Sequence, residues 1–363
     1  MKISTLSILL ILTFCANCFA HTAAPIGVFD SGIGGMTVLE KMLTMDEYDN
    51  QTFERKKDGR PDFENEQFVY FGDQANMPYG DYASYGKSDY LRKLILADAE
   101  FLLSKKAKSL VIACNTATAW GLGMVRERAL KDGVDTTGVI EAGVRSALDA
   151  PEAMLAGGGV ALGVMATPGT IASGAYERTI KEEFALRRLK GKAHVFSQGC
   201  AGLADAVEAG SLEAEKIAVE NLRQLKASAD AAKIPLKVVI LGCTHYPFVL
   251  DALKKEAPQI VFIDPALATA EECYLSLKRK GLLSKKSGFS FVSAFISVPR
   301  KGLDKKFLDD KGGLTRQCKY VRDVGEKCVW TDIKAYTPEQ ARKNSFISRA
   351  LPAVSKMLKG ENK

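Results

Sequence analysis

Short apolar runs alternate along the chain with segments in which apolar residues recur about every 3.6 positions. The short runs are rich in β-branched residues and predict strands at 26–29, 67–71, 109–113, 136–140, 159–164, 193–196, 236–241 and 260–263. One intervening segment places a single polar residue, Asp98, in an otherwise apolar helical stripe of Leu91, Leu94, Ile95, Phe101 and Leu102. Strands that alternate with helices predict an α/β fold of doubly wound parallel sheets, covered by helices on both faces.

Two segments depart from this alternation. Residues 46–66 are polar, and we expect them to form a surface insertion. Residues 284–363 show no clear strand–helix alternation and are interpreted as a region appended to the core. The last part of this region, 338–359, predicts one amphipathic helix with apolar positions Phe346, Ile347, Leu351, Val354 and Leu358.

The first 20 residues have the pattern of a secretory signal peptide. Lys2 precedes an apolar stretch from Leu6 to Phe14, and small residues stand at the positions that signal peptidase requires for a cut after Ala20. The apolar stretch is short for a membrane anchor, which needs roughly 20 residues, and lipid attachment at Cys15 or Cys18 stays open. We therefore expect a periplasmic or secreted protein in an oxidising compartment.

Composition and charge narrow the classes of function. The chain has 363 residues, 47% of them hydrophobic and 26% charged, which is typical of a globular protein of about two domains. The net charge of +7 is unevenly distributed, because residues 281–363 carry +10 whereas residues 21–280 carry −4. The charge therefore gives no indication of nucleic-acid binding by the core, and it leaves weak envelope association through the basic C-terminal region as a hypothesis.

Two of the predicted strands end in similar segments, VIACNTA (111–117) and VILGCTHYP (239–247). Each places a thiol, Cys114 or Cys243, at the carboxyl end of a strand, where open α/β sheets bind ligands. Two facing halves would bring these thiols to opposite sides of one cleft, about 6–7 Å apart if each approaches a carbon to roughly 3–3.5 Å. One thiol can then serve as base and the other as acid. The alternative is that both are buried apolar side chains.

Neighbouring polar residues could support these thiols. His245 lies two residues after Cys243 and could hold its thiolate or shuttle its proton, although it could equally be a core histidine. The segment DSGIGG (30–35) is not a good dinucleotide loop, because Thr37 stands where its third glycine should be and a carboxylate precedes the turn. We interpret Asp30 as an acid/base group in the cleft, beside backbone N–H groups that could bind an anion.

Other polar groups could surround a small ligand. The segment GDQANMPYG (72–80) is typical of a structured turn, in which Tyr79 could cap the cleft. Hydrogen-bonding partners for carboxylate and ammonium groups are offered by Asn115, Thr116, Thr118 and Thr244.

Five motifs together give a specific resemblance. DSGIGG (30–35), MPYG (77–80), ACNTATA (113–119), SGAYE (173–177) and LGCTHYP (241–247) occur in an order similar to that of the cofactor-independent glutamate racemases, in the aspartate/glutamate racemase superfamily. The resemblance runs from about Ile26 to Ala266 and implies two α/β domains around a central cleft, the second inserted in the first. It predicts a signal peptide 1–20, a first domain of 21–137 plus 264–283, a second domain of 138–263, and a basic C-terminal extension of 284–363.

The resemblance also implies roles for single residues. Cys114 and Cys243 would be the acid/base thiols, Asp30 would assist the first, and His245 would assist the second. Glu208 would be a further acidic helper, although its surroundings, GCAGLADAVE, lack a proline usual in the family. Substrate contacts would come from Asp30, Ser31, Tyr79, Gly80, Asn115, Thr116, Thr244 and His245.

The expected activity is the interconversion of L- and D-glutamate, with aspartate as an alternative substrate and without pyridoxal phosphate, metal or nucleotide. A decarboxylase or isomerase of the same superfamily, and an exported amino-acid-binding protein, remain alternatives, and a homodimer stays open. Export puts a role in cell-wall (peptidoglycan) synthesis in doubt, because that synthesis uses D-glutamate in the cytoplasm. In an oxidising compartment, Cys318 and Cys328 would form a disulfide that stabilises the fold by roughly 2.5–3 kcal/mol. Cys200 and Cys273 are expected to be buried thiols.

Overall fold

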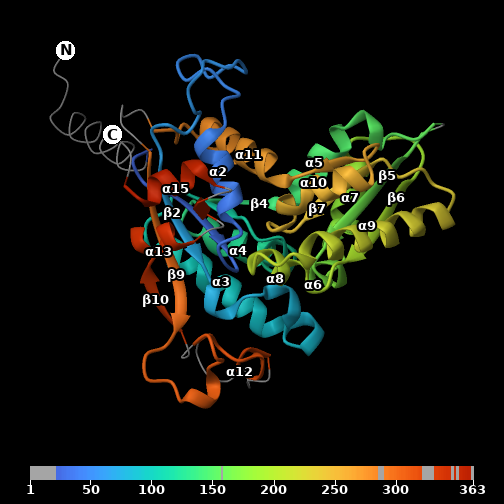
Figure 1. Ribbon diagram of the computed structural model, residues 1–363. Coiled ribbons are helices and arrows are strands. Elements are labelled where there is room, and N and C mark those ends of the chain that lie inside the picture. The colour runs from blue at the N-terminus through green and yellow to red at the C-terminus, as the bar shows by residue number, and fades with distance from the viewer. Residues whose placement is uncertain are drawn as a thin grey trace, which may run out of the picture.

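The computed structural model describes residues 22–156, 158–284, 290–320, 331–344, 347–348 and 351–360. Two sheets organise this part of the chain (Figure 1). The first has six strands in the order β10-β9-β2-β1-β3-β4, and the second has four in the order β6-β5-β7-β8. No helix among the described residues is long and apolar enough to cross a membrane. The predicted signal peptide lies outside the described residues.

The strands confirm the predicted alternation. Those of the first sheet are β1 (Ile26–Asp30), β2 (Gln67–Gly72), β3 (Ser109–Ile112), β4 (Asp135–Gly138), β9 (Phe291–Pro299) and β10 (Thr331–Ala335). Those of the second are β5 (Val160–Ala166), β6 (Ala193–Gly199), β7 (Val238–Gly242) and β8 (Val261–Ile263). All neighbours pair in parallel except β9 and β10, which are antiparallel. The α/β fold class is therefore confirmed.

Helices connect the strands and cover the sheets. The longer ones are α2 (Met36–Thr44), α3 (Ser88–Ser104), α4 (Asn115–Leu130), α5 (Val139–Asp149), α7 (Ala175–Leu186), α9 (Glu213–Ala231) and α11 (Pro265–Lys280). The shorter ones are α6 (Pro168–Ala172), α8 (Leu203–Glu208), α10 (Leu250–Glu256), α12 (Arg316–Tyr320), α13 (Pro338–Lys343) and α15 (Pro352–Leu358). Short 3₁₀ turns are η1 (Gln74–Asn76), η2 (Tyr79–Tyr85), η3 (Pro151–Ala153), η4 (Tyr246–Val249) and η5 (Lys305–Phe307).

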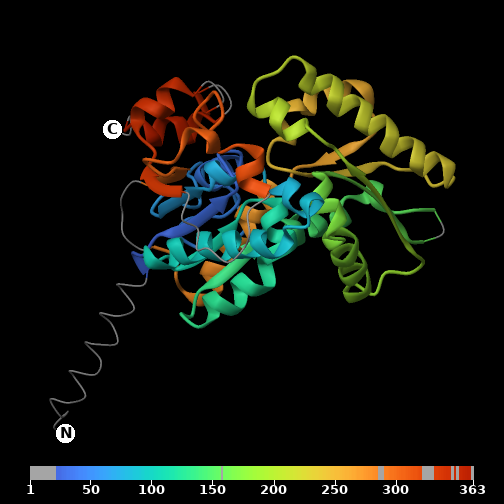
Figure 2. The ribbon, with the colours of Figure 1, turned by 90° about the horizontal axis from the view of Figure 1, so that it is seen from below.

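The two sheets share one topology. The order β2-β1-β3-β4 in the first sheet is repeated as β6-β5-β7-β8 in the second, so that β5 corresponds to β1 and β7 to β3. The strand order reverses between β1 and β3 and again between β5 and β7, and ligands bind at such reversals in open α/β sheets. The green and yellow chain of the second sheet forms a lobe beside the first (Figure 2). This arrangement matches the expected pseudo-symmetry.

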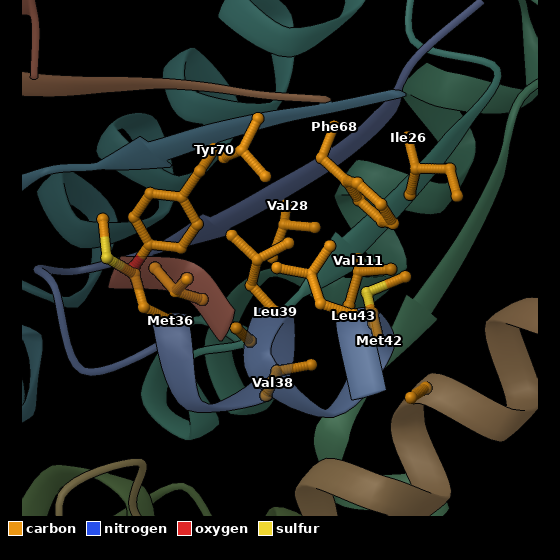
Figure 3. Close-up of a cluster of buried hydrophobic side chains, with 14 of the residues drawn as sticks. Ile26, Val28, Met36, Val38, Leu39, Met42, Leu43, Phe68, Tyr70 and Val111 are labelled. Carbon is orange, nitrogen blue, oxygen red and sulfur yellow. The ribbon is translucent and has the colours of Figure 1, made fainter. Parts of the chain in front are cut away.

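Each sheet has an apolar core against its covering helices. Ile26, Val28, Phe68, Tyr70 and Val111 point from the strands of the first sheet towards α2 (Figure 3). Met36, Val38, Leu39, Met42 and Leu43 of that helix pack against them, and all of these side chains are buried. On the other face, α3 buries Leu91, Leu94, Ile95 and Leu102, as its predicted stripe requires. This packing fixes the loops that follow β1, β2 and β3.

One predicted strand boundary was wrong, and one segment is less exposed than expected. The strand predicted over 136–140 ends at Gly138, and Val139 begins helix α5. Ile140 belongs to a helical stripe with Val144, Ala147 and Leu148, all buried against the second sheet, so the 3.6-residue spacing prevails over local β propensity. The segment 46–66 is exposed only in its middle part. At its ends Tyr48 and Phe63 are buried against Tyr274 of α11, with ring centroids 4.6 and 5.6 Å away.

Part of the C-terminal region 284–363 joins the first sheet, whereas its division from the core stays a prediction. Strand β9 pairs with β2 in parallel, with Phe295 opposite Phe71, so the C-terminal region extends the first sheet. Two buried positions of β9, Ala294 and Ser297, are not strongly apolar, which weakens the strand pattern in the sequence. The helix predicted over 338–359 is interrupted. α13 ends before Asn344, whose backbone is extended, and α15 begins at Pro352, which cannot continue a preceding helix.

The apolar positions of this C-terminal region were nevertheless identified correctly. Ile347, Leu351, Val354 and Leu358 are buried in the same core as α2. The carboxylate of Glu40 on α2 accepts hydrogen bonds from the backbone N–H groups of Ala353 and Val354, at 2.9 and 2.7 Å. Phe346 lies outside the described residues. The domain boundaries that we expect near residues 137 and 264 remain a prediction.

Candidate active site

The two thiols of interest stand at the strand-order reversals of the two sheets. Cys114 follows β3 and is the N-cap of α4, where its Sγ accepts a hydrogen bond from the Ala117 N–H at 3.4 Å. Cys243 follows Gly242, the last residue of β7. Parallel strands that are buried on both faces place their carboxyl ends at one edge of each sheet. The topology therefore brings both cysteines to the facing edges of the two lobes.

A narrow cavity of about 20 Å³ lies between these edges. It has room for about one water molecule, so an amino acid can enter only if the two lobes separate. Its lining from the first lobe is Ser31, Met77, Pro78, Tyr79, Gly80, Cys114, Asn115 and Thr116. Its lining from the second lobe is Thr167, Ala204, Gly242, Cys243, Thr244 and His245. The two predicted thiols thus border the same space. The lining contains no lysine or arginine, so a bound anion would meet backbone N–H groups, hydroxyls and His245.

Glycines allow the two lobes to approach each other at this cavity. A Cβ on Gly34 would lie 2.5 Å from Cε1 of His245, and a Cβ on Gly80 would lie 2.7 Å from Cβ of Thr167. Contacts this short do not occur between real side chains. Larger residues at these two positions would therefore separate the lobes.

Cys114 lies in surroundings that favour its neutral thiol. Its Sγ donates to Ser31 Oγ at 3.7 Å, and it is almost fully buried. Burial raises the pKa of the thiol strongly, and the negative charge of Asp30 raises it further. Hydrogen bonding with Ala117 and Ser31 opposes this shift without overcoming it. At neutral pH, Cys114 is therefore a protonated thiol in the structure as it stands.

Cys243 lies beside a histidine that is hydrogen-bonded to a glutamate. Its Sγ is 3.8 Å from His245 Nδ1, and the Nε2 of the same ring is 2.7 Å from Glu208 Oε2. Burial alone would lower the pKa of His245, but its hydrogen bonds to Cys243 and Glu208 outweigh burial and raise that pKa well above its ordinary value. A cationic imidazole beside a thiol stabilises the thiolate. The imidazole of His245 is therefore placed to exchange a proton with Cys243.

Asp30 lies behind the cavity. It is fully buried at the end of β1 and accepts a hydrogen bond from Gly32 N–H at 3.0 Å. Burial raises its pKa, and the charge of His245 and the N–H groups of Gly32 and Gly35 lower it. It acts on Cys114 through its charge and is not among the residues that line the cavity, and its contact with the substrate stays a prediction.

The other predicted contacts divide into two groups. Asn115 is held by Tyr176, whose hydroxyl donates to its Oδ1 at 2.6 Å, and Thr116 Oγ1 is 2.9 Å from Thr170 Oγ1. Both line the cavity together with Ser31, Gly80, Thr244 and His245. Thr118, by contrast, donates to the Cys114 carbonyl at 2.9 Å and does not line the cavity. Its expected role at the substrate is therefore unsupported.

Tyr79 lines the cavity, but its hydroxyl lies elsewhere. The phenol oxygen is 2.6 Å from Asp73 Oδ2 and 2.7 Å from Asp98 Oδ2, so it does not cap the cleft. A Tyr hydroxyl carries one hydrogen and cannot donate to both carboxyls. One of the two acids must therefore be protonated and donate to the phenol.

Sequence reasoning missed several lining residues. Thr167 caps α6 directly after β5, and its Oγ1 is 3.2 Å from Thr116 Oγ1 across the two lobes. Thr167 could have been identified from the sequence, because a hydroxyl residue directly after a predicted parallel strand occupies the same kind of position as Cys114. Met77 and Pro78 belong to a motif that was noted, whereas Ala204 and Gly242 have no chemical signature.

The remaining cysteines differ in what the structure describes. Cys200 and Cys273 are buried, as expected. Cys318 is buried in α12, and its predicted partner Cys328 lies outside the described residues, so that disulfide stays a prediction. Among the described ranges, no cluster of three or more histidine, cysteine or acidic side chains could hold a metal ion.

Known proteins resemble this chain in sequence and in structure. Residues 69–273 match the Asp/Glu/Hydantoin racemase family. The glutamate racemase of Desulforudis audaxviator is 32% identical over 267 residues, which cover 72% of this chain and 82% of the relative. The glutamate racemase isoform RacE1 of Bacillus anthracis superposes with a TM-score of 0.59 at 29% identity, covering 76% of this chain and 89% of that one. The glutamate racemase of Francisella tularensis, in complex with D-glutamate, superposes with a TM-score of 0.56 at 29% identity, covering 75% and 88%.

Proposed function

The chain belongs to the Asp/Glu/Hydantoin racemase family and is an amino-acid racemase, and from this premise we propose that it interconverts L- and D-glutamate by proton transfer between Cys114 and Cys243. The observation that carries the proposal is a pair of thiols on opposite lobes of one cavity, one of them in contact with His245 and both placed to serve as acid and base. Inversion at a carbon by two groups requires this complementary pair.

The proposed reaction moves one proton in and one proton out. The Cys243 thiolate removes the α-proton from one face of the amino acid, and the electron pair left on the α-carbon is stabilised by the adjacent carboxylate. The Cys114 thiol then donates its proton to the opposite face. Turnover leaves Cys243 as thiol and Cys114 as thiolate, which is the state that would act on the opposite enantiomer. His245, held by Glu208, is placed to assist proton transfer at Cys243, and the charge of Asp30 raises the pKa of Cys114.

The lining of the cavity supports an acidic amino acid as substrate. Backbone N–H groups at Ser31 and Gly80, together with the hydroxyls of Thr116 and Thr244, could receive carboxylates. The amide of Asn115 is oriented by Tyr176. The D-glutamate found in the Francisella tularensis relative supports the same class of ligand. Aspartate is the alternative that the same groups could bind.

The proposal is tested with the purified, reduced chain and both enantiomers of glutamate and of aspartate. We expect racemisation of glutamate, its loss in Cys114→Ala and Cys243→Ala, and near wild-type activity in Cys273→Ser, a matched control at a buried thiol outside the cavity. Release of CO₂ from these substrates would favour a decarboxylase. Tight binding of an amino acid by calorimetry, without any turnover, would favour a binding protein.

We also propose that the protein acts outside the cytoplasm. This proposal rests on the N-terminal sequence, in which a short apolar segment precedes small residues at Cys18 and Ala20. The test is N-terminal sequencing of the protein recovered from the periplasm or medium. A first residue of His21 is expected, whereas an intact Met1 in the cytoplasmic fraction would overturn the proposal.

A further inference from the structure

The cavity wall formed by Met77, Pro78, Tyr79 and Gly80 is contacted by a segment far away in the sequence. Lys319 of α12 donates from Nζ to the Met77 carbonyl at 2.5 Å, and the Tyr320 hydroxyl donates to the Pro78 carbonyl at 3.4 Å. These two carbonyls are consecutive in the loop that lines the cavity. Helix α12 therefore holds the backbone of the loop by two adjacent contacts.

Aromatic contacts fix α12 on the same element. The Tyr320 ring stacks on Tyr85, with centroids 4.6 Å apart and planes 6° apart. It meets Tyr82 edge to face, with centroids 4.8 Å apart. Both partners lie on η2, which begins at Tyr79. Aromatic pairs of this geometry add to the stabilisation that burial provides, so α12 packs on η2 in a position to restrain the loop.

The beginning of the loop has an anchor in the same C-terminal region. Ser297 on β9 donates to Asp73 Oδ1 at 2.5 Å and accepts from the Ala75 N–H at 2.9 Å. Asp73 also receives hydrogen bonds from Asn76 Nδ2 and from the Tyr79 hydroxyl. All of these groups are buried. The loop is thus tied at both its ends to residues that follow position 290.

From these contacts we propose that Lys319, Tyr320 and Ser297 are positioning residues for the active site, which hold the loop 74–80 in the wall of the cavity. None of them lies within residues 69–273, the part that matches the racemase family. The C-terminal region would then complete the substrate site of this chain instead of serving only as a basic surface. The inference rests on the proposed function for its kinetic consequence but not for its structural one.

The structural consequence is tested by hydrogen–deuterium exchange of peptides that cover residues 74–86, in the full-length protein without substrate. Lys319→Met removes the ammonium group and keeps most of the aliphatic stem, and we expect it to speed exchange in this loop by about tenfold. Lys319→Arg keeps a donor and should restore protection. Lys311→Met removes the same charge at an exposed site of the same region and should leave the loop unchanged. Unchanged exchange in Lys319→Met would overturn the inference.

The kinetic consequence is measured on the same variants with the amino acid that the wild type racemises. We expect Lys319→Met to raise KM by about five- to tenfold with little change in kcat, because the loop forms a wall of the cavity and carries neither thiol. Tyr320→Phe should show a smaller increase. A parallel loss of kcat and thermal stability, with KM unchanged, would indicate a merely structural role. If the wild type racemises nothing, the proposed function fails while the exchange experiment still decides this inference.

Discussion

The buried pair of acids beneath the cavity leads to a prediction about stability. The Tyr79 hydroxyl lies between Asp73 and Asp98, and can donate to only one of them. Asp73 also accepts from Ser297 and Asn76, as an ionised carboxylate should. Burial and the charge of Asp73 raise the pKa of Asp98 well above its ordinary value. We infer that Asp98 is protonated and donates to Tyr79, which in turn donates to Asp73.

The substitution Asp98→Asn tests this assignment, because a neutral amide can replace a neutral carboxyl of the same shape. In the wild type, the unfolded chain releases the Asp98 proton above its ordinary pKa of 3.8, whereas the folded chain keeps it. The unfolded state is therefore favoured progressively as pH rises, by about 1.4 kcal/mol per pH unit for one proton. The variant lacks this cost. Its stability relative to the wild type should increase by roughly that amount per unit between pH 5 and pH 7, as long as the folded protein retains the proton.

Denaturant unfolding, followed by circular dichroism at pH 5, 6 and 7, measures this difference. Asp89→Asn, at an exposed site of the same helix, is the control and should show no comparable trend. Asp73→Asn should instead destabilise the protein by about 2–3 kcal/mol, since an amide NH₂ group would face hydrogen-bond donors. A stability difference between Asp98→Asn and the wild type that does not change with pH would refute the assignment.

Two further predictions concern the second lobe and the C-terminal region. Glu208→Gln removes the anionic partner of His245, so the pKa of His245 should fall. We expect kcat/KM at pH 7 to drop by about tenfold and the pH–rate profile to shift. An unchanged profile would mean that Glu208 does not act through His245. Peptide mass mapping of the exported protein with and without reductant should show Cys318 linked to Cys328, and alkylation of Cys318 without reduction would contradict that pairing.

Much of the fold could be predicted because its strands are apolar on both faces. β1, β3, β5 and β7 are continuous apolar runs that end in polar or small residues, and their positions were identified to within a few residues. The same pattern located Cys114 and Cys243, since a thiol directly after such a run lies at the ligand-binding edge of a sheet. These strand ends were recognisable in the sequence because the buried apolar run stops where the polar and reactive residues begin.

The C-terminal region could not be predicted in the same way. β9 joins the first sheet beside β2, a pairing between residues more than 200 positions apart that no local pattern encodes. The contacts that Ser297 and Lys319 make at the loop 74–80 depend on that pairing and on the packing of α12 against η2. The orientation of the Tyr79 hydroxyl away from the cavity likewise depends on Asp98. In the sequence, Asp98 is only the one polar residue in the apolar stripe of α3.

The central claim is that two thiols on opposite faces exchange protons with the substrate, and isotope incorporation in D₂O tests it most directly. L-glutamate and D-glutamate are each incubated with the reduced enzyme, and both enantiomers are separated at low conversion for measurement of α-deuterium. Two bases predict that the product enantiomer carries deuterium while the recovered substrate remains almost unlabelled, from either direction. Equal labelling of substrate and product from the first turnovers would indicate one base that acts on both faces, and would contradict the account.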